Sequence, residues 1–253
     1  MNLKATTKKS VAGYDFEQYS VWGSEMKSSM ILASLALAAA AGAAQAGGDN
    51  INVGDTIRFF DRDGNLGGGE FGVAKLPASN IELFRTFCLQ RNEYMDYNAA
   101  GFNVVGVSTQ TVAGGVNLAA EVAYLYTMFR AGTLPGSAIT DGSYGGGNHG
   151  TEADSLQRAI WSFMGQLNPN SAEVTSDVQA VALRNAASAA IASNSWSGIG
   201  NVRILNLTWA TGRSGFGAGT DAQDQLVIIP LPTGAALGLA GLSLLAIRRR
   251  AAR

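Results

Sequence analysis

Residues 117–130, Asn-Leu-Ala-Ala-Glu-Val-Ala-Tyr-Leu-Tyr-Thr-Met-Phe-Arg, mark the point at which the chain changes from strand-like to helix-like periodicity. Large apolar side chains recur in this stretch at i, i+3, i+4 and i+7: Val122, Leu125, Tyr126 and Phe129. This spacing puts them on one face of a helix, and Asn117 is a suitable residue to cap its N-terminus.

Strand-like segments lie on both sides of this helix. Four precede it and two follow it: 56–60, 70–76, 83–89, 102–108, 202–209 and 225–229. Two more helices are expected in between, over 151–166, where Thr151 and Asp154 form a variant capping box, and over 171–193. The order of elements predicts an α+β fold, an antiparallel β-sheet or barrel with helices inserted between its early and late strands.

The amino-terminal part of the chain contains a secretory signal. Residues 26–46 consist of a basic start, an apolar stretch, and the small-x-small site Ala44-Gln45-Ala46 before Gly47. The segment 1–25 ahead of it is polar and has no apolar period, so we interpret it as a mis-set translation start. A cleavable signal peptide over 26–46 predicts that the rest of the chain is exported.

The carboxyl-terminal segment 230–253 forms a second hydrophobic signal. Pro230-Leu231-Pro232 is followed by an apolar run over 233–247 and then by Arg248-Arg249-Arg250. At about 1.5 Å per residue this run is marginal for crossing a hydrocarbon core of roughly 30 Å, so it is either a processing signal or an ordinary membrane anchor. In both cases the arginines stay in the cytoplasm and residues 47–229 lie outside it.

This tail resembles the PEP-CTERM family of bacterial sorting tails, in which an exosortase recognises a short Pro-containing motif, a hydrophobic helix and a basic end. The family usually has Glu between its prolines, where this chain has Leu231. The resemblance implies an exosortase-type processing enzyme as a partner and transient membrane attachment through the C-terminal helix. It also implies a destination at the cell surface or in an extracellular, exopolysaccharide-containing matrix.

The charge of the exported segment excludes some classes of partner. Between the two signals the chain has ten basic and sixteen acidic residues, a net charge of about −6. Nucleic acids and anionic lipid surfaces are bound by basic patches, so neither is expected as a partner. The abundant Gly and the periodic apolar residues indicate a turn-rich, folded extracellular domain.

The chain has a single cysteine, Cys88. In an oxidising compartment it cannot form an internal disulfide, so it is buried and inert, paired between chains, lipidated, or chemically used. On the helix predicted over 151–166, Gln157 shares a face with Trp161 and Met164, at i+4 and i+7. Burying an amide without partners costs roughly 1–3 kcal/mol, so this glutamine requires hydrogen bonds or a chemical reason to be there.

Phe87-Cys88 and Leu156-Gln157-Arg158-Ala159-Ile160-Trp161 resemble the thioester domains of bacterial surface adhesins. In that family a Cys is cross-linked to the Gln of a Thr-Gln-x-Ala-aliphatic-Trp motif, and here Leu156 replaces the Thr. The resemblance implies a Cys88-Gln157 thioester supported by Phe87, Ala159, Ile160 and Trp161. It further implies attachment to amines or hydroxyls of a surface or matrix polysaccharide or protein, as a single-use reaction and not an enzyme activity, without a cofactor.

One alternative is a non-catalytic matrix or carbohydrate-binding protein, in which Gln157 caps backbone groups of the sheet and Cys88 packs beside it. In such a protein, aromatic rings could form a platform on which a sugar stacks. The candidate rings are those of Tyr94, Tyr97, Trp196 and Trp209, for which we favour packing in the core.

A cysteine hydrolase and a metal site are both disfavoured. A hydrolase would combine Cys88 with His149 and Asp154, but activated cysteines sit at helix N-termini or beside cations, and Cys88 lies in an apolar, strand-like run. Residues 61–65, Asp-Arg-Asp-Gly-Asn, imitate the start of a calcium loop but lack the Glu at the twelfth position. We expect a turn at this point and no bound metal.

Overall fold

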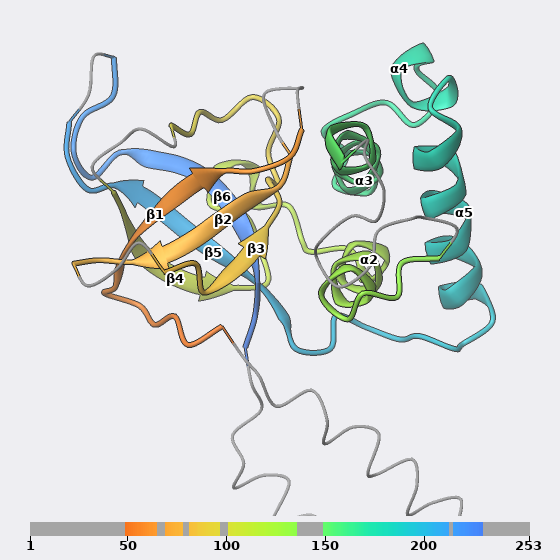
Figure 1. Cartoon of the computed structure of the whole chain (residues 1–253), viewed down its shortest axis with the longest axis horizontal. Coiled ribbons are helices and arrows are strands. Elements are labelled where there is room, and N and C mark those ends of the chain that lie inside the picture. Colours follow the sequence, from red (N-terminus) through yellow and green to blue (C-terminus); the bar gives the residue numbers. More distant parts are fainter. Residues whose placement is uncertain are drawn as a thin grey trace, which may run out of the picture. The chain divides into compact units, whose positions relative to one another are not determined.

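The computed structural model (Figure 1) describes residues 49–64, 69–77, 81–96, 101–135, 149–212 and 215–229. By contacts, the chain divides into Met1–Ala46 and Gly47–Arg253. The predicted start extension, signal peptide and sorting tail all lie outside the described residues. Among the helices of the described part, none combines the length and the apolar character needed to cross a membrane.

Six antiparallel strands form one sheet in the order β3-β2-β1-β4-β5-β6. Their bounds are β1 Thr56–Asp61, β2 Phe71–Lys75, β3 Phe84–Thr86, β4 Phe102–Ser108, β5 Val202–Trp209 and β6 Asp221–Ile228. The first two strands pair as the predicted hairpin, with Phe59 opposite Val73. The α+β prediction with an antiparallel sheet is therefore confirmed.

The two edges of the sheet meet at the residues that follow β3. Cys88 forms an isolated β-bridge with Gln225 of β6. Two backbone hydrogen bonds flank this bridge, from Leu89 N to Asp224 O at 3.1 Å and from Leu226 N to Phe87 O at 3.3 Å. The sheet is thereby closed, and we call it the barrel. Residues 87–89 form its seam with β6.

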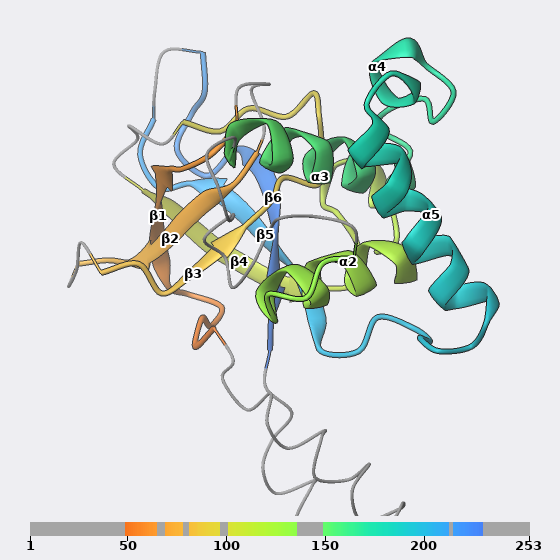
Figure 2. The ribbon, with the colours of Figure 1, turned by 45° about the vertical axis from the view of Figure 1, so that its right-hand side comes forward.

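The helices pack on one side of the barrel, beside this seam. In the described part of the chain they are α2 Ala120–Arg130, α3 His149–Phe163, α4 Ala172–Thr175 and α5 Val178–Ala192. A short 3-10 turn, η1 Ala113–Gly115, lies between β4 and α2 in the sequence. In Figure 1, α2 and α3 lie between the barrel and α5, and Figure 2 shows the same layering from a second direction. The chain therefore has a β layer and a helical layer with the seam between them.

Two hydrophobic cores result, one inside the barrel and one between the barrel and the helices. Alternation along the seam distributes its side chains between them, since successive residues of a strand point to opposite faces. Phe87 and Leu89 belong to the helical core, whereas Cys88 belongs to the barrel core. Trp161 of α3 also reaches the barrel core.

The predicted helix boundaries need correction. Asn117 does not cap α2, because its side chain accepts a hydrogen bond from Gln110 and the helix begins after Ala119 without a side-chain cap. The helix α3 already begins at His149, so Thr151 and Asp154 lie inside it and form no capping box. Gly165, with φ +70, ends that helix by adopting the left-handed conformation.

The helix predicted over 171–193 is divided in two at Asp177. The side chain of Asp177 accepts a hydrogen bond from Ala180 N at 2.9 Å and so caps α5. The same carboxylate is held by Ser155 and Arg158 of α3. The break is therefore fixed by contacts between helices as well as by the local sequence.

The two ends of the described domain lie next to each other. Asp49 N donates to Ile228 O at 3.0 Å, and Ile228 N donates to the Asp49 carboxylate at 2.8 Å. Arg130 of α2 forks the same carboxylate, at 2.7 and 2.9 Å. This buried cluster ties the beginning of the domain to the end of β6.

Candidate functional site at the barrel seam

Cys88 and Gln157 are brought into contact, although 69 positions separate them in the chain. Cys88 N donates to Gln157 Oε1 at 3.1 Å, and Gln157 Nε2 donates to Cys88 O at 2.8 Å. Both residues are 0% exposed. The carboxamide of α3 thus pairs with the backbone of the seam in the way that a neighbouring strand would.

The helical face that presents Gln157 is the predicted one. Gln157, Trp161 and Met164 are all buried, as expected for positions i, i+4 and i+7 of a helix that packs on a core. The predicted hydrogen-bonding requirement of this amide is met by Cys88.

The thiol of Cys88 points to β6. Its Sγ donates to Gln223 Oε1 at 2.7 Å and accepts a longer hydrogen bond from Gln225 Nε2 at 3.4 Å. Both glutamines are buried, and both reach the sulfur from β6. The sulfur therefore contacts one amide acceptor and one amide donor.

Burial raises the pKa of the Cys88 thiol to about 12, and hydrogen bonds from Gln225 and from the backbone of Gly69 act in the opposite direction. The thiol is therefore protonated at neutral pH. Nucleophilic cysteines of hydrolases have lowered pKa values instead, so the shift argues against the hydrolase alternative.

Gln90 and Asp224 lie behind the thiol and its glutamines. The backbone carbonyl of Gln90 accepts a hydrogen bond from Gln223 Nε2 at 2.5 Å. The side-chain oxygen of Gln90 accepts one from Asp224 N at 2.7 Å. The Asp224 carboxylate accepts from Val112 N at 2.7 Å and from Asn206 Nδ2 at 3.2 Å. Burial raises the pKa of Asp224 to about 6, against the lowering effect of these donors.

The predicted supporting residues surround the pair from both cores. Phe87 packs edge-on against Phe129 of α2, with ring centroids 5.0 Å apart, and belongs to the helical core with Ala159 and Ile160. Trp161 lies in the barrel core together with Cys88. These four residues are at most 1% exposed, so the contact between Cys88 and Gln157 is sealed from water.

The described rings among the four candidates for a sugar platform divide between two places. Tyr94 stacks on Trp209 with centroids 6.1 Å apart, but Trp209 is 1% exposed, which confirms its core role. Trp196 packs against Tyr124 on the helical side. Tyr97 lies outside the described residues.

The described part of the chain does not bring together the three residues of the hydrolase alternative, Cys88, His149 and Asp154. Asp154 is buried on α3, and the side chain of His149 is outside the described part of the chain. In that part, His, Cys, Asp and Glu form no cluster of three or more that could hold a metal ion.

Sequence reasoning missed the residues of β6 that contact the thiol. The strand was predicted to begin at Gln225, which left Gln223 and Asp224 in a loop, whereas β6 begins at Asp221. The signal that could have found them is the polar run Gln223-Asp224-Gln225 between apolar Ala222 and Leu226. Three consecutive polar residues in a strand place at least one of them in a core, where each needs a partner.

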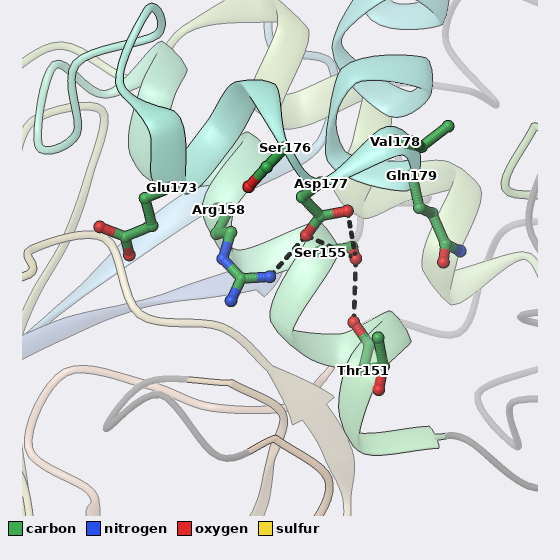
Figure 3. A pocket seen from close by; sticks show the side chains of 8 residues that line it. All are labelled: Thr151, Ser155, Arg158, Glu173, Ser176, Asp177, Val178 and Gln179. Atoms are coloured by element: carbon green, nitrogen blue, oxygen red, sulfur yellow. Dashed lines mark hydrogen bonds and ion pairs between the residues drawn. The ribbon is translucent and has the colours of Figure 1, made fainter.

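A separate cavity of about 470 Å³ lies among α3, α4 and α5 (Figure 3). Its lining comprises Thr151, Ser155, Arg158, Glu173, Ser176, Asp177, Val178 and Gln179. Ser155 and Arg158 both point to Asp177 across it, with Ser155 Oγ 2.9 Å from either carboxylate oxygen. Because Ser155 and Arg158 bond to the carboxylate that caps α5, we assign the cavity a structural role.

No protein-family model, no curated protein and no solved structure matches this chain. The assignment of a function therefore rests on the chemistry of the described residues and on the sequence patterns of the two predicted signals.

Proposed function

We propose that the chain is a secreted, surface-sorted protein that attaches covalently to an acceptor through an internal thioester between Cys88 and Gln157. The observation that carries the proposal is the pair of hydrogen bonds, 3.1 and 2.8 Å long, that holds the Gln157 carboxamide on the backbone of Cys88. The primary amide is thereby held on the backbone of the residue that carries the free thiol, and both residues are fully buried.

The contact favours attack of the thiol on the amide carbon. The backbone N–H of Cys88 donates to Gln157 Oε1, so it polarises the carbonyl and stabilises the negative charge that develops on that oxygen during attack. Holding the Gln157 carboxamide on the backbone of Cys88 keeps it next to the residue that carries the thiol, and so supplies part of the high effective concentration that a poor electrophile requires. The thiol itself points to β6 and has to rotate toward the carboxamide to attack it. The raised thiol pKa makes the reaction slow, but one event in the life of each molecule is sufficient.

The thioester is an activated acyl group. An amine, or less readily a hydroxyl, attacks it, forms an amide or ester with the Gln157 side chain and releases Cys88 as a thiol. Phe87 and Trp161 protect the bond from water until the acceptor arrives. Each molecule reacts once, so the protein is a covalent adhesin and not an enzyme.

The location follows from the two ends of the chain. The signal peptide over 26–46 exports the protein, and the tail over 230–253 holds it at the membrane until an exosortase-type enzyme processes it near Pro230-Leu231-Pro232. The acceptor is then a polysaccharide or protein of the cell surface or extracellular matrix.

A second candidate is a non-catalytic matrix or carbohydrate-binding protein. The same hydrogen bonds favour it, because Gln157 satisfies both backbone groups of Cys88 and the thiol is already bonded to Gln223. In this case the Cys88-Gln157 contact serves to close the seam against α3.

The intact mass of the mature protein, purified without amines, tests the proposal. Wild type is expected to be lighter than its encoded sequence by one ammonia, and methylamine is expected to label it at Gln157. Cys88→Ala and Gln157→Ala should have their encoded masses and take up no methylamine, whereas Gln110→Ala, an exposed control, should behave as wild type. An encoded mass for wild type would refute the thioester and favour the non-catalytic protein.

A further inference from the structure

Two glutamines of β6 contact the Cys88 sulfur in different ways. Gln223 offers its carbonyl oxygen, which accepts the S–H hydrogen bond at 2.7 Å. Gln225 offers its amide nitrogen, which donates to the sulfur at 3.4 Å. Both side chains are at most 2% exposed, so neither contact is made in solvent.

Packing alone does not account for Gln225. Its Oε1 is buried and has no hydrogen-bond partner in the part of the chain that the structure describes. Apart from the sulfur, its Nε2 makes only long contacts, with Gln223 O at 3.4 Å and Met95 Sδ at 3.6 Å. An apolar side chain of the same shape would fill this space without leaving a carbonyl unpaired. The contact with the thiol is the feature that an apolar residue would lose.

We propose that Gln225 is the donor that stabilises the Cys88 thiolate during its attack on Gln157, and that Gln223 is the acceptor that holds the thiol proton beforehand. A hydrogen bond donated to sulfur favours the charged form, and one accepted from S–H favours the neutral form. The two glutamines therefore act on the same sulfur in opposite directions. This inference deepens the thioester function proposed above and rests on it.

The step is balanced without a cofactor or an oxidant. The S–H bond of Cys88 and the C–N bond of the Gln157 carboxamide break, and the bond between Sγ and Cδ forms. The thiol proton leaves with the nitrogen as ammonia. Gln223 loses its hydrogen-bond donor, the thiol, when the thioester forms. It regains this donor when an amine or hydroxyl opens the thioester and releases the thiol. The two glutamines, which we call the amide pair, therefore favour this opening of the thioester.

Alkylation of the native free thiol by iodoacetamide at one fixed pH tests the amide pair. The experiment compares the free-thiol forms of wild type, Gln225→Met and Gln223→Met. If wild type carries a thioester, its free thiol is first released with methylamine, and otherwise the protein is used as purified. Gln225→Met is expected to slow alkylation about tenfold for each unit by which the thiol pKa rises. Gln223→Met is expected to accelerate it, and Gln110→Met, the exposed control, should leave it unchanged.

A merely structural role predicts the opposite result for Gln225. Loosened packing would expose the thiol and accelerate alkylation in both variants, so an equal or faster rate in Gln225→Met would overturn the proposal. Gln225→Glu replaces the donor by an acceptor of the same shape, and it should slow alkylation even if Gln225→Met fails to fold.

Loss of ammonia after refolding, followed by intact mass, is the second measurement. The rate is expected to be about tenfold lower in Gln225→Met than in wild type for each unit of thiol pKa. A wild type that never loses ammonia would refute the proposed function, whereas the alkylation rates would still decide whether the two glutamines control the thiol.

Discussion

Asp224 shows how a single buried side chain connects the site to the stability of the fold. It is 0% exposed, and donors of the described residues, among them Val112 N and Asn206 Nδ2, satisfy its oxygens. Burial nevertheless raises the pKa of its carboxyl from 3.8 to about 6. The folded protein therefore binds this proton more tightly than the unfolded chain does.

The pH dependence of stability is expected to reveal Asp224. Because the pKa is higher in the folded state, its contribution favours folding below about pH 4 and is lost as the pH rises to about 6. The loss amounts to about 3 kcal/mol at most. In Asp224→Asn, urea unfolding across this range should lack that decrease. Asp221→Asn, its exposed neighbour, should retain most of it, because Asp221 is only the smallest cause of the shift. Identical profiles for Asp224→Asn and wild type would contradict the assignment.

At the scale of elements, local patterns were sufficient where the chain forms regular strands. The bounds predicted for β4 and β5, 102–108 and 202–209, are those observed. Both strands lie in the middle of the sheet and pair with each other along nearly their whole length. The edge strand β3 is much shorter than predicted, at Phe84–Thr86, since the seam residues after it meet β6 through one isolated bridge and two backbone hydrogen bonds and form no continuous ladder.

Helix ends were less predictable, because tertiary contacts compete for the capping groups. Asn117 has the right chemistry for a cap but bonds to Gln110 instead. The stretch 171–193 is rich in alanine, which favours a helix wherever it stands. The sequence pattern therefore gives no sign of the break at Asp177.

Asp177 is expected to hold α5 to α3. Asp177→Ala removes the cap of α5 and leaves Arg158, whose side chain is only 17% exposed, without this carboxylate (Figure 3). Loss of a cap and of a half-buried ion pair should lower the free energy of unfolding by about 2 to 3 kcal/mol. Val178→Ala, beside it and 81% exposed, is the control and should change stability little. Equal unfolding midpoints for the two variants would show that the cap contributes nothing.

The candidate site was predictable in part, and the limit lies in the closure of the barrel. Cys88 and Gln157 could be singled out because one is the only cysteine and the other is polar on an apolar helical face. Gln223 and Gln225 could not, because their role depends on β6 meeting the seam 135 positions away in the chain. Such a contact leaves no local periodicity in the sequence.

At the scale of the whole molecule, the fold gathers the attachment points of the two predicted signals. Asp49 and Ile228 are hydrogen-bonded, so the domain begins and ends at one place. Gln225 lies three residues before Ile228, or about 10 Å along the strand. The thiol is therefore close to the end of the described domain, yet it is buried between the barrel and α3.

Sorting and covalent attachment are accordingly expected to be separable. Cys88→Ala should leave secretion and tail processing unchanged, because the signals lie beyond the folded domain, but it should abolish methylamine labelling. Removal of Arg248-Arg249-Arg250 should do the reverse, since it takes away the cytoplasmic charge that fixes topology and leaves the folded domain able to take up the amine. Replacing the three arginines by lysines keeps the charge and should restore sorting.

Fractionation of cells measures sorting, and the intact mass of the protein measures methylamine labelling. Equal labelling of wild type and Cys88→Ala would remove the chemical half of this model, and unchanged sorting without the arginines would remove the topological half.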